Sequence, residues 1–565
     1  VDERILADGE VLRGVDAAQV EALVPALRAA GVASVAICLI NAFRNGANEQ
    51  RVAEVLRAKA PDLYLSLSST VAPQIREYPR ASTTAINAYT TPITEPYLRG
   101  LAAGLERSKV ANRPLIMLSS GGVIGAEVAG RNPVRMIESG PAAGALAAAY
   151  FAERLGLDRL MSFDMGGTTA KACLIEGRKP FVTGMLEVDR KYRFCEGSGM
   201  PLTVPSIDMI EIGAGGGSIA YVDDLGLMKV GPESAGSEPG PACYGRGGLL
   251  PTVTDADLVL GLLDPDNFLG GDMPLDKPAA ERAIDVLAAE LDVTREQAAA
   301  GVYRIVAEAM AGAARAHATD RGVDHRGLPL LAFGGAGPVH ACAVGELLQS
   351  AAVIFPPQAS VLSAFGALVT PVRLDLVRSA LGRLGALDWD QVQGLVREMQ
   401  GEASAALAEA GAPAGGIRLK LGADLRYAGQ QNEVTVGFES DAVESRNAEA
   451  IREVFESAYF AQYGVNPSHV PIEVVSWRLT AQGPEDRVDS ERPLADVVAL
   501  PEREKAVPLW PAAGPARVYA RASLGRGQRL AGPALIEERE TTIVLPPGWD
   551  AVVDDSGCIT AKRGT

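Results

Sequence analysis

The residues best suited to chemistry lie in one short stretch between two apolar runs. Residues 160–163 and 172–175 are apolar, and they flank the segment Asp164-Met-Gly-Gly-Thr-Thr169. This pattern predicts a β-hairpin with a glycine-rich turn. Because Gly166 and Gly167 lack Cβ atoms and tolerate positive φ angles, they would let a phosphate approach the backbone N–H groups closely. The turn is therefore a candidate phosphate-binding site.

The side chains of this turn extend the same chemistry. Thr168 and Thr169 place hydroxyl groups beside the glycine amides, and Asp164 closes the first strand. A carboxylate at that position can hold a hydrated Mg²⁺. We therefore predict nucleotide binding by Gly166, Gly167, Thr168 and Thr169, and metal binding and a catalytic role for Asp164. The alternative is a tight hairpin with a capping aspartate. The segment is neither a Walker A loop nor a dinucleotide fingerprint.

A second glycine cluster follows about 170 residues downstream. Gly334, Gly335, Ala336 and Gly337 come after the apolar run 330–333 and before an Ala-rich helical pattern at 339–349. Such a turn lets an adenosine lie against bare backbone at a helix N-terminus, so these four residues are predicted nucleotide contacts. A phosphate hairpin followed by an adenosine turn resembles the order found in the actin, hexokinase and heat-shock ATPase superfold.

A third cluster, Gly213-Ala-Gly-Gly-Gly-Ser218, follows a strand pattern at 207–212. Adjacent glycines can offer several N–H groups to an anion, so Gly215 and Gly216 are predicted to contact the nucleotide. The alternative is a flexible turn. Asp208 is a second candidate catalytic residue, as a base or as the partner of a metal-bound water. Its alternative role is that of a strand-end residue capping a turn. Asp255 and Asp257 are further acidic candidates.

Several stretches, taken together and in order, resemble the hydantoinase A/5-oxoprolinase family, which includes the β-subunit type of acetone carboxylase. They are Ile137-Glu-Ser-Gly-Pro-Ala-Ala-Gly144, Ile207-Asp-Met-Ile-Glu-Ile-Gly-Ala-Gly-Gly-Gly-Ser218, Gly240-Pro-Ala-Cys-Tyr-Gly-Arg-Gly-Gly248 and Pro251-Thr-Val-Thr-Asp-Ala-Asp257. The likeness also covers Gly532-Pro-Ala-Leu-Ile-Glu-Glu538 and Leu545-Pro-Pro-Gly-Trp549.

The resemblance implies an α/β fold with actin/hexokinase-like ATPase lobes and a β-rich C-terminal α+β domain. Residues 1–150 would be the remainder of the N-terminal lobe, residues 151–370 the ATPase lobe with both turns, and residues 371–565 the C-terminal domain. Two departures from the family pattern stand out. No first Asp-x-Gly-Gly-Thr hairpin occurs before residue 100, so an upstream segment is expected to be missing and the first lobe incomplete. Lys171 stands where the family more often has an acidic residue.

The function implied by the resemblance is that of an ATP-dependent cyclic-amide hydrolase subunit that phosphorylates the carbonyl oxygen of its substrate. ATP and Mg²⁺ would be needed, and a hydantoinase-B-type subunit would be the partner in a hetero-oligomer. The alternatives are a ketone carboxylase subunit of the acetone or acetophenone type, and a nucleotide-gated protein without catalysis on the same superfold. The small-molecule substrate would be a cyclic amide or a ketone.

Composition excludes several other classes of protein. The 565 residues carry a net charge of −17 with acidic and basic residues interspersed, which argues against a nucleic-acid partner. No run of 18 apolar residues occurs, so no membrane span is predicted. Six cysteines lie scattered without a Cys-x-x-Cys pair, a pattern typical of free thiols in a cytoplasmic protein. The missing Gly-x-Ser-x-Gly elbow disfavours a serine hydrolase.

Periodicity predicts the elements that position these residues. Helix and strand patterns alternate from residue 15 to residue 67, which indicates a mostly parallel sheet, and the doubly wound part is expected to end near residue 370. The Ala/Gly-rich segment 142–154 predicts a thin helix that can cross another helix closely. Five aromatic residues of the C-terminal part could anchor a partner or fill a core: Tyr427, Tyr459, Tyr463, Trp477 and Trp549.

Overall fold

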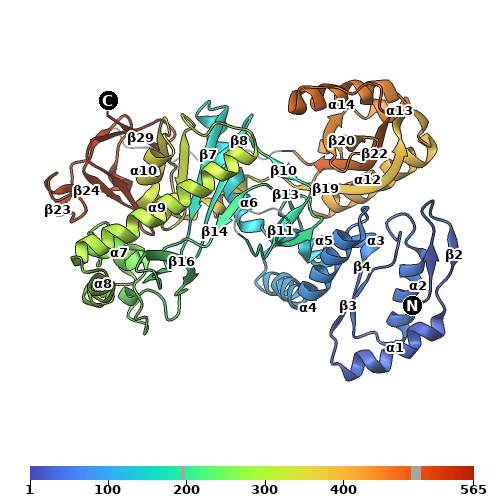
Figure 1. Ribbon diagram of the computed structural model, residues 1–565, viewed down its shortest axis with the longest axis horizontal. Coiled ribbons are helices and arrows are strands. Elements are labelled where there is room, and N and C mark those ends of the chain that lie inside the picture. Colours follow the sequence, from blue (N-terminus) through green and yellow to red (C-terminus); the bar gives the residue numbers. More distant parts are fainter. Residues whose placement is uncertain (193–196, 485–497, 565) are drawn as a thin grey trace. The chain divides into compact units, whose positions relative to one another are not determined.

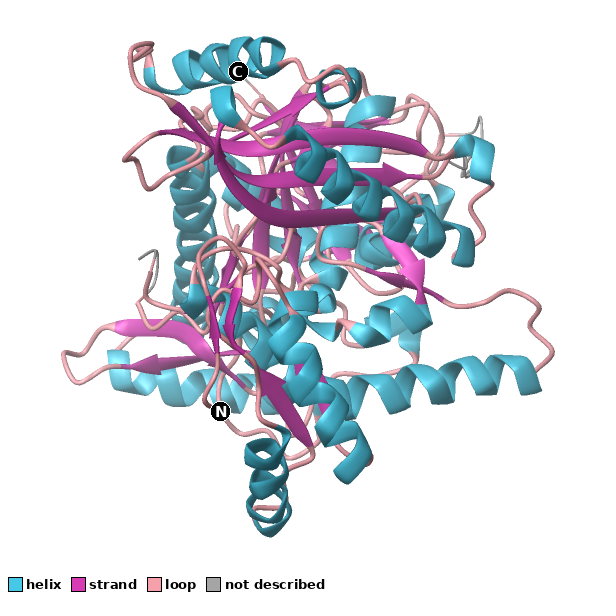
Figure 2. Ribbon diagram, turned by 90° about the vertical axis from the view of Figure 1, so that its right-hand side faces the viewer, coloured by secondary structure: helices cyan, strands magenta, loops and turns pink. Residues whose placement is uncertain are grey.

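A computed structural model describes residues 1–192, 197–484 and 498–564 of the protein. The chain forms two compact units, each assembled from three separate stretches. The first unit comprises Val1–Ala142, Val182–Ser206 and Thr370–Asp486, and the second comprises Ala143–Phe181, Ile207–Val369 and Arg487–Thr565. Helices and strands occur throughout both units, so the protein is of mixed α/β class (Figures 1 and 2). The division into three consecutive domains, residues 1–150, 151–370 and 371–565, stays a prediction.

The first unit carries these principal elements, in chain order: β1 Arg4–Ile5, β2 Val11–Arg13, α1 Ala17–Ala29, β3 Ser34–Ile37, α2 Ala47–Lys59, β4 Tyr64–Leu67, α3 Ser68–Val71, α4 Glu77–Arg107, β5 Leu115–Met117, β6 Val123–Gly125, α5 Ala126–Arg131, β11 Leu186–Val188, β12 Met200–Leu202, β19 Arg373–Arg383, α12 Trp389–Glu409, β20 Arg418–Tyr427, β21 Val434–Phe438, α13 Asp441–Glu444, α14 Ala448–Tyr463 and β22 Ile472–Gln482. Helix α4 runs through Pro92 and Pro96 as one helix.

The second unit is reached through α6 Ser139–Arg154, whose first residues precede the unit boundary. Its further elements are β7 Arg159–Met165, β8 Ala170–Glu176, β9 Lys179–Pro180, β14 Ile210–Ile212, β15 Ser218–Val222, β16 Met228–Ser234, α7 Val253–Val259, α8 Lys277–Leu291, α9 Arg295–Asp320, β17 Leu330–Phe333, α10 Gly337–Leu347, β18 Val353–Phe355, α11 Leu362–Val369, β23 Arg503–Lys505, β24 Ala516–Ala520, β25 Arg529–Ala531, β26 Ala534–Glu537, β27 Thr542–Leu545, β28 Trp549–Val553 and β29 Ile559–Arg563.

One large sheet organises the second unit, with the strand order β14-β8-β7-β17-β18-β29-β28-β25. Only the β7–β17 and β17–β18 pairs along this path are parallel, so this sheet is mixed. In the first unit, where the alternation at residues 15–67 indicated parallel strands, β3 and β4 pair in parallel. Strands from residues 529–563 complete the large sheet, so the doubly wound part does not end near residue 370 as expected. The helices α7, α8, α9 and α10 pack on one another beside this sheet (Figure 1).

Small residues let two helices of this unit touch at the backbone. The carbonyl of Ala143 in α6 lies against the Cα of Gly366 in α11, where a Cβ would have no room. Gly144 likewise faces the ring of Phe333, because a Cβ at Gly144 would lie 2.7 Å from the ring. The prediction of a thin helix that crosses another helix closely is therefore confirmed. This packing fixes the strand β17, which ends at the second glycine turn.

An antiparallel sheet of order β19-β22-β20-β21 forms the C-terminal part of the first unit, with α12 and α14 packed on it (Figure 1). The aromatic residues considered above as partner anchors mostly fill cores. Trp477, Tyr427 and Tyr459 are at most 7 % exposed within this unit, and Trp549 is 4 % exposed in the second unit. Only Tyr463 among the five is exposed, at 46 %. Burial in the core, the alternative kept open above, holds for four of them.

Candidate nucleotide site

The predicted hairpin is present. Strands β7 and β8 pair antiparallel, with Asp164 opposite Lys171 and Met165 opposite Ala170. The N–H of Gly166 donates to the carbonyl of Thr169 over 3.0 Å and closes the turn. Gly167 and Thr168, at its tip, are exposed. The glycine-rich turn therefore projects from the end of β7, where a ligand can reach it.

The second glycine turn lies directly beside the first. Strand β17 runs parallel to β7, with Phe333 opposite Asp164, so both strands end at the same edge of the sheet. The N–H of Ala336 donates to the carbonyl of Met165 over 3.0 Å. A Cβ on Gly334 would lie 2.5 Å from a carboxylate oxygen of Asp164, and Gly334 has a φ of +88°, so glycine is required there. Parallel strands end together where α/β sheets bind ligands.

The third glycine loop, residues 213–217, is hydrogen-bonded to the backbone of the hairpin. The N–H of Gly216 donates to the carbonyl of Gly166 over 3.0 Å, and that of Gly217 donates to the carbonyl of Gly167 over 2.6 Å. The N–H of Gly215 donates to Oγ of Ser218. These amides are buried and already bonded within the protein, and nucleotide contact by Gly215 and Gly216 stays a prediction. What the loop contributes is the backbone position of the hairpin.

Three exposed N–H groups remain for a ligand. Within the described residues, no group accepts a hydrogen bond from the N–H of Gly167, Thr168 or Gly335. Gly167 and Thr168 belong to the hairpin, and Gly335 belongs to the second turn. Because Gly216 bonds to Gly166 and lies near Ala336, the hairpin and the turn are held in one place. Clustered free amides of this kind form an anion-binding concavity.

Asp164 lies at this cluster, and the pKa of its carboxyl group is raised. Burial raises the pKa of its carboxyl group to about 6, and the charge of Lys171 opposes part of the rise. A carboxylate held in such surroundings gains from a nearby cation. In the described part of the chain, no group of three or more His, Cys, Asp or Glu side chains is arranged for a metal ion. A metal at Asp164 would therefore take its other ligands from phosphate and water, as Mg²⁺ commonly does.

Lys171, noted above as a departure from the family pattern, has a defined place. Its Nζ donates to Oγ1 of Thr169 over 2.8 Å and pairs with the carboxylate of Glu211 over 2.8 Å. The lysine thus links the turn to the neighbouring strand β14. It leaves Thr168 as the threonine whose side chain remains exposed at the tip.

Asp208 does not join the glycine cluster. It lies beside Cys173, whose thiol donates to the Asp208 carbonyl. Cys173 follows Thr169, the last residue of the hairpin turn, by four residues, or about 13 Å of strand. The Asp208 carboxylate accepts hydrogen bonds from Arg321 at 2.6–2.7 Å, and the His317 imidazole lies 3.8 Å away. Arg321 in turn stacks on the ring of Phe181 at 4.2 Å. The catalytic role of Asp208 stays a prediction, and its geometry is that of a salt bridge.

Asp255 serves as a structural cap. Its buried carboxylate accepts hydrogen bonds from the N–H groups of Ala242, Cys243 and Thr252, and from the Thr252 hydroxyl. With Thr252 it forms a capping box at the start of α7. Asp257, two residues further along α7, bonds to His340 in the first turn of α10.

The loop between β26 and β27 also reaches the second turn, which the sequence did not reveal. The carbonyl of Glu540 would lie 3.8 Å from a Cβ on Gly335, and Glu540 bonds to Ser360 over 3.2 Å. Glu538 beside it pairs with Arg521, and burial raises the pKa of Glu538 while Arg521 opposes the rise. Both glutamates line a cavity of about 2040 Å³ in this unit. The stretch 532–538 was part of the family resemblance, but nothing in it signalled proximity to residue 335.

The family models agree with this architecture. The hydantoinase/oxoprolinase model matches residues 80–376, the model of its N-terminal region matches residues 1–60, and the model of its C-terminal domain matches residues 511–563. The chain belongs to the hydantoinase/oxoprolinase family, as the resemblance predicted. Whether a further segment precedes residue 1 stays a prediction.

Individual relatives cover nearly the whole chain. It is 33 % identical to caprolactamase subunit alpha of Pseudomonas jessenii over 99 % of this chain and 81 % of the relative. It is 31 % identical to the acetophenone carboxylase gamma subunit of Aromatoleum aromaticum over 99 % of this chain and 78 % of the relative. The solved structure of ATP-dependent caprolactamase from Pseudomonas jessenii superposes with a TM-score of 0.81 at 31 % identity, covering 100 % of this chain and 82 % of the other.

Two further observations bear on the predicted setting of the protein. Five cysteines, Cys38, Cys173, Cys243, Cys342 and Cys558, are free thiols as expected, and Cys195 lies outside the described residues. Across the described ranges, the helices are all too short or too polar to cross a membrane.

Proposed function

We propose that this chain is the ATP-dependent subunit of a cyclic-amide hydrolase, and that it phosphorylates the carbonyl oxygen of its substrate. The observation that carries the proposal is the convergence of the 166–169 hairpin and the 334–337 turn, with free amides at Gly167, Thr168 and Gly335. The hairpin would bind the phosphates and the turn the adenosine. This division of labour is that of the actin/hexokinase-like ATPase superfold, which we propose for the second unit.

The residues present suit such chemistry. Phosphoryl transfer depends on positioning and charge neutralisation more than on covalent catalysis. The amides of Gly167 and Thr168 and the hydroxyls of Thr168 and Thr169 would hold the phosphates, and Asp164 would hold Mg²⁺ directly or through water. When bound, Mg²⁺ would neutralise charge on the phosphates. Phosphorylation of the lactam oxygen would make the carbonyl carbon more electrophilic. Water would add to that carbon, the C–N bond would break as the nitrogen takes a proton, and a second water would hydrolyse the resulting acyl phosphate to the ring-opened acid and phosphate.

One relative keeps a second candidate function in view. The likeness to the acetophenone carboxylase gamma subunit, at 31 % identity, favours a ketone carboxylase subunit as the alternative. In that case the phosphoryl acceptor would be an enolate oxygen, and carbonate rather than water would complete the reaction. A nucleotide-gated protein without catalysis is a third candidate on the same superfold.

We also propose a companion polypeptide of the hydantoinase B type. Two relatives are named as subunits, which supports assembly into a hetero-oligomer. Hydrolysis that removes the phosphate without breaking the C–N bond would return the lactam and waste the ATP, so a companion that receives the phosphorylated lactam would favour ring opening. A cytoplasmic location stays a prediction.

The experiment is ADP release by this chain together with its co-encoded hydantoinase-B-type subunit. Caprolactam, hydantoin and 5-oxoproline are offered as lactams, and acetophenone with bicarbonate as the ketone. We expect lactam-stimulated ADP release that requires Mg²⁺, with ring-opened product in equal amount. Ketone-dependent release that requires bicarbonate would replace the hydrolase by the carboxylase. ADP release indifferent to all these compounds would contradict both and favour the nucleotide-gated protein.

A further inference from the structure

A fully buried pair of ionisable side chains lies behind the glycine loops. Asp257 of α7 and His340 of α10 approach to 3.2 Å between Oδ2 and Nε2, with side-chain exposures of 3 % and 0 %. Tyr303 of α9 stacks on the imidazole with ring centroids 4.7 Å apart. Its hydroxyl donates to the carbonyl of Val339 over 3.1 Å. Three helices therefore meet at His340.

Each member of the pair lies one helical turn from a glycine loop. Thr254, three residues before Asp257, donates to the carbonyl of Gly216 from both its N–H and its Oγ1, each over 2.8 Å. On the other side, His340 follows Gly337 by three residues, in the first turn of the helix that carries the second glycine turn. The Asp257–His340 pair thus connects the helix that holds the third loop to the helix that begins at the adenosine turn.

Stability alone gives no reason for such a pair. A buried ionisable pair is costly unless further hydrogen bonds satisfy both groups, and apolar residues of similar volume often serve stability equally well. Here Oδ1 of Asp257 and Nδ1 of His340 have no partner within the described residues. Such a pair instead fixes the orientation of α7 relative to α10, because its one hydrogen bond forms only when the two helices are correctly rotated.

We propose that Asp257 and His340 are positioning residues that hold the 334–337 turn in register with Gly216 and thereby set the affinity for the nucleotide. The inference rests on the proposed function for the identity of the ligand. Both side chains are buried and act through the helices that carry the loops. Breaking their hydrogen bond lets α10 rotate, so the 334–337 turn, which bonds to Met165 through the N–H of Ala336, shifts against the hairpin.

The test measures the full chain in two ways. Calorimetric titration with Mg·ADP gives the nucleotide Kd, and hydrogen-exchange mass spectrometry of the ligand-free chain reports on residues 334–340 and 213–217. We expect Asp257→Leu and His340→Leu to weaken binding by about tenfold or more, the scale of losing a partner that orients a ligand-binding group. The amides of both loops should exchange faster. His340→Gln retains a side-chain N–H that can reach Asp257, so it should restore binding to within about threefold.

A matched control separates positioning from stability. Leu530→Ala removes a 2 % exposed side chain from β25, at the far end of the sheet from the glycine turns. It should lower the Tm but leave Kd and loop exchange unchanged. The proposal is overturned if Asp257→Leu behaves like this control. Altered loop exchange in Asp257→Leu, in a chain that binds no nucleotide even when unmutated, supports positioning and refutes the proposed function instead.

Discussion

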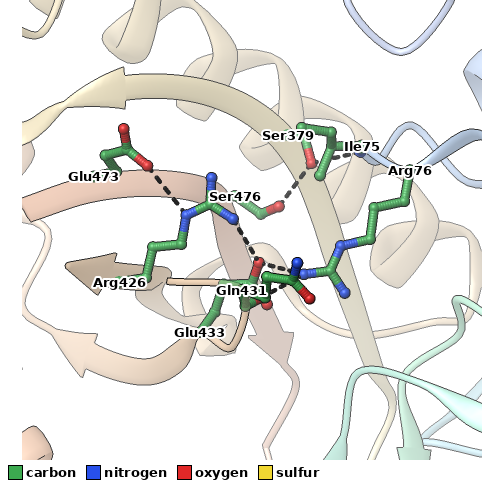
Figure 3. A network of polar contacts seen from close by, with 8 residues as sticks. All are labelled: Ile75, Arg76, Ser379, Arg426, Gln431, Glu433, Glu473 and Ser476. Carbon is green, nitrogen blue, oxygen red and sulfur yellow. Dashed lines mark hydrogen bonds and ion pairs between the residues drawn. The ribbon is translucent and has the colours of Figure 1, made fainter. Parts of the chain in front are cut away.

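The glycine cluster of the second unit and the polar network around Arg76 in the first unit are held together in opposite ways. In the cluster, three loops meet through backbone hydrogen bonds, and they approach one another this closely because side chains are missing. In the network, long charged side chains span the gap between α4 and the β20–β21 hairpin. Arg76 donates to the Gln431 carbonyl and to Glu433, each over 2.7 Å (Figure 3).

The remaining contacts of the network continue this pattern. Arg426 reaches Glu433 and Glu473, while Ser379 links the N–H of Ile75 to Ser476 (Figure 3). Exposed ion pairs contribute little each, because the solvent screens them and long side chains lose entropy. Where the loops of the cluster touch, as at Gly215 and Gly334, the backbone leaves no room for an added Cβ, whereas a side-chain network tolerates the loss of a member. The glycine cluster is therefore suited to a site whose geometry must be fixed. The Arg76 network is suited to a contact that need only hold two segments together.

The largest predicted effect comes from adding one methyl group to the cluster. A Cβ at Gly215 would lie 2.6 Å from the backbone of Gly167 and Thr168, so Gly215→Ala must displace the hairpin. We expect a loss of about 1–3 kcal/mol in the free energy of unfolding, the cost of overpacking, together with loss of nucleotide binding. Denaturant unfolding and Mg·ADP titration measure the two effects.

Gly167→Ala is the matched control. Nothing lies within 4 Å of a Cβ there, and the φ of Gly167 is not positive. The variant should keep its stability to within about 0.5 kcal/mol, as surface substitutions usually do. Its affinity should fall by about tenfold or more, because the methyl group blocks the close approach of a phosphate to the amide. Unchanged affinity in Gly167→Ala would show that no phosphate approaches this turn.

The next effect concerns charge at the cluster. Asp164→Asn should fold normally but lose about 10²-fold in ATP-dependent turnover of the complete assembly, the scale of one positioned catalytic group. The kcat for ADP release, measured at saturating Mg²⁺, checks this. An unchanged kcat would remove Asp164 from the mechanism.

The same variant changes the pH dependence of stability. The folded pKa of Asp164 is about 6 against an ordinary 3.8, so the folded state keeps a proton that the unfolded state has lost between these values. Stability from this group is therefore present below about pH 4 and falls as pH rises to 6, by roughly 3 kcal/mol for two pKa units. Asp164→Asn should remove that slope in the ligand-free protein. A slope identical to that of the unsubstituted chain would contradict the assignment.

The sequence predicted those features that depend on neighbouring residues. The hairpin at 166–169 and the strand and helix around 334–337 follow from short-range patterns, and both are present. The glycine clusters were located correctly for the same reason. What failed depended on partners distant in the chain. Periodicity does not reveal that β29 pairs with β18, nor that the amides of Gly215 and Gly216 are used within the protein.

Asp208 shows the same limit at a single residue. Its position close to the 213–217 loop in the sequence suggested a shared site. Yet an extended strand, β14, lies between Asp208 and that loop and holds them apart. Arg321, its salt-bridge partner, is 113 residues away in the sequence. Thr254, His340 and Glu540 escaped notice for the converse reason, because helices and loops distant in the chain bring them to the turns.

The smallest predicted effect tests the side-chain network at Arg76. This residue has φ +82° and ψ 101° at the N-cap of α4, a conformation that costs a non-glycine residue about 1 kcal/mol or more. Arg76→Ala loses the contacts to Gln431 and Glu433 and keeps the strain, so we expect it to be destabilised by about 1 kcal/mol. Arg76→Gly loses the same contacts but relieves the strain, and glycine also suits an N-cap. The glycine variant should therefore be the more stable of the two by about 1 kcal/mol, and both should bind Mg·ADP with unchanged Kd.

The denaturant midpoints of the two variants measure the difference in stability. An alanine variant as stable as the glycine variant would show that the backbone at residue 76 is unstrained, and a changed Kd would show that the network also shapes the nucleotide site.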